Sequence, residues 1–153
     1  MTIASRSLLK SRFVLASPAL ALTTRASRAA LPASLTLPQA IEHASNLAAL
    51  IHALHANDHA LLAHTLRDLV AEPARRALVP GFDAVQRAAR EAGALGCSLS
   101  GSGPAIFAVA DCSRATVIAT AMAATWEALG IACTTRVCVP DMRGARVLES
   151  TCA

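Results

Sequence analysis

The 153-residue chain is 54% apolar but only 3% aromatic, which excludes a disordered chain and predicts a core built from Ala, Leu, Val and Ile. Its net charge of +4 comes from scattered arginines, with Lys10 as the only lysine. Because no basic block is interleaved with aromatic residues, the charge pattern argues against nucleic acid as a partner.

The first predicted element is a buried strand, "FVLAS" at 13–17, which runs into a loop. A secretory signal peptide is the competing interpretation, since a basic start precedes this apolar stretch. Pro18 in the middle of the stretch and the lack of a small-x-small cleavage site before Arg25 favour the strand. No apolar window reaches the length of a membrane-spanning helix, so no membrane partner is predicted.

A short helical turn at 23–32, ended by Pro32, is the next predicted element. Pro38 then opens a strong helix, "PQAIEHASNLAALIHAL" at 38–54. Helical spacing places its apolar residues on one stripe, which consists of Ile41, Ala44, Leu47, Ala48, Ile51 and Leu54.

Two more helices follow, separated by a connection that prolines interrupt. Asp58 is a natural N-cap for the helix predicted at 59–71. The segment 72–82 contains two prolines and predicts a kinked connection. The helix predicted at 81–93 ends at Gly93.

The stretch "GALGCSLSGSGPAIFAVAD" at 93–111 predicts two short apolar strands around the tight turn "SGSGP". Gly101 and Gly103 take a positive φ at little cost, and Pro104 fixes the exit of the chain from the turn. Such a turn can aim backbone N–H groups at an anion. A hairpin whose glycines serve geometry alone is the alternative, and local evidence favours it, because the string matches neither G-x-G-x-x-G nor a Walker A loop.

A helix predicted at 113–130, a strand at 132–139 and a tail complete the order of elements. Strands and helices in this order predict a single α+β domain, with a small, mostly antiparallel sheet and helices packed on one side.

Candidate metal ligands and nucleophiles receive little support from their spacing. His52, His55 and His59 are spaced for one helical face, but "AND" interrupts the helix between the last two, which favours a solvated face over a metal site. No G-x-S-x-G pattern is present. Five cysteines without C-x-x-C spacing predict reduced, buried, small hydrophobic residues in a cytoplasmic protein and no zinc site; they are Cys97, Cys112, Cys133, Cys138 and Cys152.

The stretch at 93–111 resembles the third conserved motif of the GHMP kinases, and within that superfamily the chain is similar to the homoserine kinase family. Three further stretches support the resemblance in order along the chain: "VLASPALALTTRASRAALP", "DLVAEPARRALVPGF" and the ending "GARVLES". The resemblance covers 13–153 and identifies this range as the C-terminal, substrate-side domain. The segment 1–12 matches nothing in the family.

The resemblance implies ATP-dependent phosphorylation of the L-homoserine hydroxyl to O-phospho-L-homoserine, a step toward threonine. The family's phosphate loop, P-x-x-x-G-L-G-S-S-A, does not occur in this sequence. The main ligands for ATP and Mg²⁺ are likewise expected to be absent from this chain, so no catalytic or metal-binding residue is assigned. We therefore expect a C-terminal half that is inactive alone, from a truncated or split gene.

The resemblance also implies the substrate-binding residues. In the "AR-x-x-LP" and "EP-x-R" segments of the family an arginine holds the substrate carboxylate, and these positions are Arg28 and Arg75 here. Arg76 is an alternative to Arg75, since it is adjacent. The turn beside the pocket is expected to need glycine for close approach as well as for φ, and it contributes Ser100, Gly101, Ser102 and Gly103.

Two other functions stay open. One is another GHMP kinase that acts on a different substrate with a carboxylate, and the other is a catalytically silent remnant or partner-binding module. The expected partners are L-homoserine and a separately encoded N-terminal half, and a homodimer is compatible with the resemblance.

Overall fold

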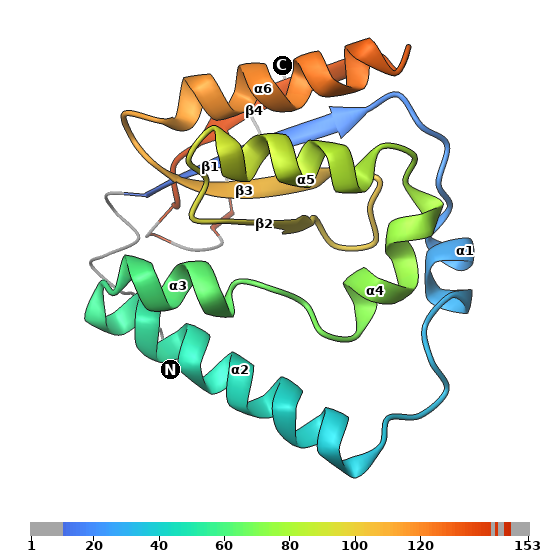
Figure 1. Cartoon of the computed structure of the whole chain (residues 1–153), viewed down its shortest axis with the longest axis vertical. Helices are drawn as coiled ribbons and strands as arrows, with labels where there is room; N and C mark the ends of the chain where they lie inside the picture. The colour runs from blue at the N-terminus through green and yellow to red at the C-terminus, as the bar shows by residue number, and fades with distance from the viewer. Residues whose placement is uncertain (1–10, 142, 144–145, 148–153) are drawn as a thin grey trace.

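A computed structural model describes residues 11–141, 143 and 146–147 (Figure 1). Most of the unmatched segment 1–12, and most of the ending "GARVLES", lie outside the described residues. No helix in the described part of the chain is long and apolar enough to cross a membrane.

The centre of the fold is an antiparallel sheet of four strands in the order β2-β3-β1-β4. The strands are β1 (Ser11–Pro18), β2 (Gly96–Leu99), β3 (Ile106–Asp111) and β4 (Cys133–Cys138). All four strands are confirmed where the sequence predicts them. Because β1 is an inner strand that pairs with both β3 and β4, its apolar residues belong to the sheet.

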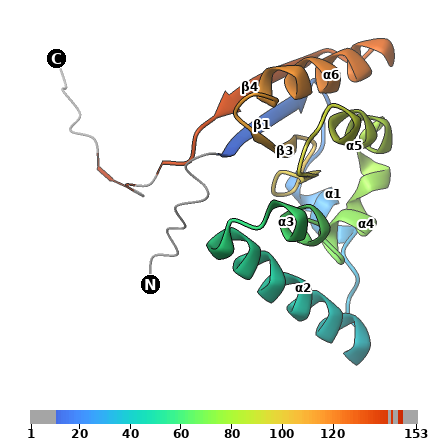
Figure 2. The same ribbon diagram turned by 60° about the vertical axis from the view of Figure 1, so that its left-hand side comes forward.

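Helices α5 (Phe82–Glu91) and α6 (Ala115–Ala128) cover one face of this sheet (Figures 1 and 2). This arrangement confirms the predicted α+β layers. The core beneath them is mostly aliphatic, as the low aromatic content requires, with Trp126 as its largest fully buried side chain. The Trp126 indole N–H donates to the carbonyl of Pro80 at 3.0 Å, which satisfies the polar atom of this buried ring.

Helices α2 (Leu37–Ala56) and α3 (His59–Thr65) form an antiparallel hairpin beside the sheet (Figure 2). A second, smaller apolar cluster joins this hairpin to β3 through Ala53, Leu62 and Val109. Thr36 and Gln39 form a capping box at the start of α2, and Asp58 caps α3 as predicted.

The apolar stripe predicted on α2 is largely exposed. Ile41 is 57% exposed and Leu47 is 51% exposed. The helix instead turns Ala53 and the amide of Asn46 inward, and Asn46 donates to the carbonyls of Thr65 and Arg67 at 2.9 and 3.1 Å. Tertiary hydrogen bonding by Asn46, and not the predicted apolar stripe, therefore contributes to the orientation of α2.

The helix predicted at 59–71 is wrong beyond Thr65, where α3 ends. Asp68 explains the break, because its Oδ1 accepts from the N–H groups of Val70 and Ala71 at 2.8 and 2.7 Å. These bonds lead into a separate helix, α4 (Ala71–Arg75), and then a 3₁₀ turn, η2 (Arg76–Leu78). The kinked connection is thus confirmed, and α1 (Thr24–Ala29) confirms the predicted helical turn before α2.

We expect Trp126→Phe to lower the free energy of unfolding by about 2 kcal/mol, because it leaves a cavity and removes the bond to Pro80. Urea denaturation followed by far-UV circular dichroism measures this change. Val117→Ala, on the same helix but 53% exposed, is the matched control and should change stability by less than about 0.5 kcal/mol. Equal losses in the two variants would contradict the assigned core.

Candidate functional site

Three segments that are far apart in the sequence meet at one end of the sheet: α1, α4 and the turn at 100–104. The Ser27 hydroxyl on α1 donates to the carbonyl of Ser102 at 2.6 Å, across 75 residues of sequence. Arg75 on α4 donates from Nε to the carbonyl of Ser27 at 3.0 Å and from Nη1 to the carbonyl of Gly101 at 3.2 Å. A single guanidinium therefore joins all three segments.

The turn itself is a tight connection between β2 and β3. Its ends are closed by Ser100 N–H, which donates to the carbonyl of Ala105 at 2.8 Å, and by Gly103 N–H, which donates to that of Ser100 at 3.1 Å. Among the described residues, the N–H groups of Gly101 and Ser102 have no hydrogen-bond acceptor. Two such groups next to an arginine form a local environment suited to an anion.

Backbone conformation accounts for the two turn glycines. Gly101 has φ +61° and Gly103 has φ +76°, a region that side chains with a Cβ rarely adopt. A Cβ at Gly101 would meet nothing within 4 Å, and one at Gly103 would make ordinary contacts of 3.5 Å with Leu22 and Leu99. The predicted close approach at the turn has no counterpart among these described neighbours.

The predicted arginines differ in their surroundings. Arg28 follows Ser27 directly and is exposed, without a hydrogen-bond acceptor in the described part of the chain. Arg75 is half-buried and uses two of its donors on the carbonyls above, which leaves Nη2 without a partner there. Arg76 is directed to α5, where Nη2 donates to Asp83 at 2.6 Å, and this carboxylate raises the pKa of Arg76. Of the two adjacent arginines, Arg75 is the one at the turn.

A carboxylate network beside Arg75 was not predicted from the sequence. Glu72 accepts from the Ser98 hydroxyl at 2.5 Å and from the Gln86 amide at 3.0 Å. The same Gln86 nitrogen donates to the carbonyl of Cys97 at 2.8 Å. The sequence held one signal for this network, the polar Ser98 between two apolar residues of a buried strand.

The cysteines only partly match the prediction of buried hydrophobic residues. Cys97 is buried and Cys133 is half-buried, but Cys112 and Cys138 are exposed because they lie just past β3 and at the end of β4. The four described cysteines are free thiols. Burial, and after it the charge of Glu72, raise the pKa of the Cys97 thiol to about 12, and Arg90 opposes the shift.

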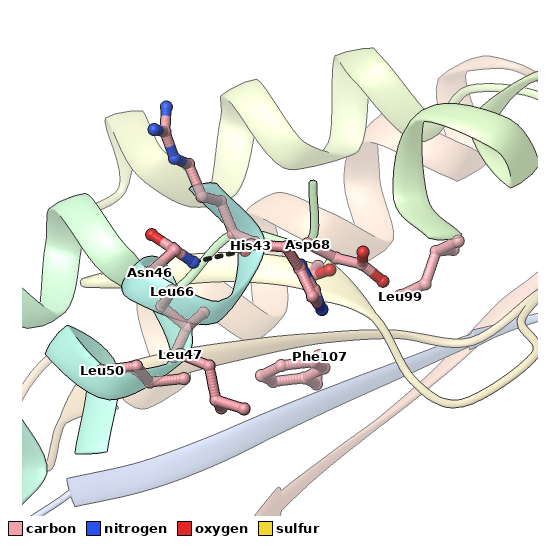
Figure 3. Close-up of a pocket in the computed structure, with 10 residues that line it drawn as sticks. His43, Asn46, Leu47, Leu50, Leu66, Asp68, Leu99 and Phe107 are labelled. Carbon is pink, nitrogen blue, oxygen red and sulfur yellow. Dashed lines mark hydrogen bonds between the residues drawn. The ribbon is translucent and has the colours of Figure 1, made fainter. Parts of the chain in front are cut away.

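A cavity of about 260 Å³ lies between α2 and the sheet, close to the turn (Figure 3). Its apolar wall includes Leu47, Leu50 and Phe107, and its polar lining includes His43 and Asp68. The Nδ1 atom of His43 is buried without a hydrogen-bond partner. This site combines an apolar wall with a carboxylate and an imidazole.

The three histidines with helical spacing, for which the sequence favours a solvated face over a metal site, are not grouped as a ligand set. His52 and His55 are exposed, and Nδ1 of His59 lies 3.6 Å from Oδ1 of Asp111. In the range that the structure describes, no three His, Cys, Asp or Glu side chains are grouped to hold a metal ion.

Known proteins match this chain along most of its length. A family profile described as GHMP kinases C terminal matches residues 50–128. The chain is similar to the homoserine kinase of Picosynechococcus sp., with 39% identity over 135 residues, which is 88% of this chain and 44% of that protein. It is also similar to the crystal structure of homoserine kinase from Cytophaga hutchinsonii, with TM-score 0.82 and 38% identity, covering 84% of this chain and 41% of that one. The chain thus spans less than half the length of these relatives.

We expect the Cys97 thiol to resist alkylation in the native chain at about pH 8, by on the order of a hundredfold relative to Cys112 in the same sample. Burial and the raised pKa both suppress its thiolate. A timed iodoacetamide pulse with peptide mass spectrometry measures the two rates.

The raised pKa also has a consequence for stability. Below the ordinary thiol pKa of 9.0 the protonated form prevails in both folded and unfolded chains, and between 9.0 and about 12 only the unfolded chain ionises. Stability should therefore fall as pH rises through that window.

In the alkylation experiment, equal rates for Cys97 and Cys112 in native protein would contradict the assignment of Cys97 as a buried thiol with a raised pKa.

Proposed function

This chain belongs to the GHMP kinase C-terminal domain family, and from that premise we propose that it forms the substrate-side part of a homoserine kinase. The proposed reaction transfers the terminal phosphoryl group of ATP to the hydroxyl of L-homoserine, in the cytoplasm. The observation that carries the proposal is the meeting of three family segments at the Arg75 guanidinium.

The charges at this meeting point suit an amino-acid carboxylate. Arg28 and the Nη2 atom of Arg75 have no acceptor in the described chain, and the N–H groups of Gly101 and Ser102 are likewise unpaired there. A guanidinium binds a carboxylate through parallel N–H bonds, and turn N–H groups add to the same field. We assign to Arg28, Arg75 and the turn, Ser100 to Gly103, the binding of L-homoserine.

The described residues do not fit the family's cofactors. The carboxylates around α4 are already used: Glu72 by Ser98 and Gln86, Asp83 by Arg76, and Oδ1 of Asp68 by two backbone N–H groups. Mg²⁺ prefers free carboxylates together with phosphate oxygens, and a nucleotide phosphate needs a cradle of donors. We therefore assign ATP and Mg²⁺ to the part of the relatives that this chain does not span.

A catalytically silent module is the second candidate, and it is favoured by the Glu72 and Asp83 carboxylates, which are bonded to other side chains and so are not free to hold Mg²⁺. Phosphoryl transfer needs a bound donor beside the bound acceptor. Under this second candidate, the domain would keep the fold and bind a partner without turnover. A third alternative is a GHMP kinase that acts on a different substrate with a carboxylate. Measuring turnover with a panel of substrates distinguishes this alternative from a homoserine kinase.

A chimaera tests the reaction. Residues 13–153 replace the matching C-terminal part of the Picosynechococcus homoserine kinase, and ADP release is measured with ATP, Mg²⁺ and L-homoserine. We expect turnover by the chimaera and none by the 153-residue chain alone. Turnover with L-serine or galactose but not with L-homoserine would reject the substrate, and a folded but inactive chimaera would favour the silent module.

The assignment of Arg75 is tested in the same chimaera. Arg75→Ala should raise the KM for L-homoserine about ten- to a hundredfold while the KM for ATP stays unchanged, because one charged contact to the carboxylate is lost. Arg76→Ala is the matched control, since its guanidinium pairs with Asp83. Equal effects of Arg75→Ala on both substrates would point to a folding defect.

A further inference from the structure

Helix α4 is too short to hold its own position. It has five residues, none of them buried, and its N-cap residue, Val70, makes no side-chain cap, so that, within the described chain, only the Asp68 carboxylate accepts from its first N–H group. A helix of this length gains little from its own hydrogen bonds, so tertiary contacts must fix where it lies. This matters because α4 carries Arg75.

The Glu72 carboxylate supplies such contacts at the start of the helix. Its two oxygens accept from Ser98 on β2 and from Gln86 on α5, at 2.5 and 3.0 Å. Ser98 is only 7% exposed, and β2 and α5 both belong to the main core. Hydrogen bonds to an ionised acceptor are among the stronger ones, so Glu72 ties a marginal helix to the rigid part of the fold.

Because Glu72 and Arg75 belong to the same short helix, the bonds that hold Glu72 also fix the position of Arg75 at the candidate site. Residues 72 and 75 are three apart and therefore lie on one face of the helix. Arg75 reaches the carbonyls of Ser27 and Gly101 from that face. We propose that Glu72 is a positioning residue, whose bonds to Ser98 and Gln86 hold α4 so that the Arg75 guanidinium lies between α1 and the glycine turn.

That Glu72 thereby prepares Arg75 to bind the substrate carboxylate rests on the proposed function. That Glu72 positions Arg75 does not rest on it. It is measured on the Arg75 side chain of the full 153-residue chain, without substrate or ATP. The probe is hydrogen exchange at Arg75 Nε–H, which donates to Ser27 and is followed by NMR in ¹⁵N-arginine-labelled protein. Comparison with Arg75→Lys assigns the signal.

We expect slow exchange at Arg75 Nε–H in the unmodified chain and about tenfold faster exchange in Glu72→Ala. Glu72→Gln should restore most of the protection. Its amide oxygen still accepts from Gln86, and the Ser98 hydroxyl accepts from the new amide nitrogen by rotating. A purely structural role for Glu72 would lower global stability without a specific change at Arg75.

Asp83→Asn is the matched control, because it removes a carboxylate bonded to the adjacent Arg76. Arg75 exchange should stay unchanged in this variant. Folded Glu72→Ala that keeps its protection at Arg75 overturns the proposal. If Glu72→Ala does not fold, Ser98→Ala decides: faster exchange supports the proposal and unchanged exchange overturns it. An inactive chimaera would count against the proposed function alone, since this measurement involves no turnover.

Discussion

The Arg75 guanidinium donates to the carbonyls of Ser27 and Gly101, and the candidate site depends on these two bonds. Helices α1 and α4 have six and five residues, too few to persist in isolation. The turn between β2 and β3 needs positive φ at two positions and forms only a short loop. A cation that satisfies two backbone carbonyls, together with the Ser27–Ser102 bond, fixes the relative position of these three weak elements.

The rigid support for this junction is the face of the sheet covered by α5 and α6. Successive side chains of β2 point to opposite faces of the sheet, so neighbouring residues of this strand contact different parts of the fold. Cys97 enters the aliphatic core, while Ser98 donates to Glu72 on α4. Within the described residues, β2 is an edge strand that pairs only with β3, so a polar side chain there connects the core to elements outside the sheet.

The charged groups around the turn are suited to binding an acceptor molecule and not to the phosphoryl transfer itself. Around the turn, the described chain offers unpaired guanidinium and N–H donors, whereas the nearby carboxylates are already bonded. Donors of this kind bind an acceptor molecule through its carboxylate, but they do not hold Mg²⁺ or orient an attacking hydroxyl. Positioning of an acceptor is therefore the contribution that this domain makes under the proposed function.

The sequence by itself determined the four strands, most helix starts and the glycine turn, because side-chain periodicity, caps such as Asp58 and positive φ are local properties. The family motifs likewise picked out Arg75. Only the tertiary structure decided that the α2 stripe is exposed and that Arg75 rather than Arg76 meets the turn. It also revealed the bond between Glu72 and Ser98, which are 26 residues apart. Such contacts depend on how separate elements pack, and no local pattern encodes their partners.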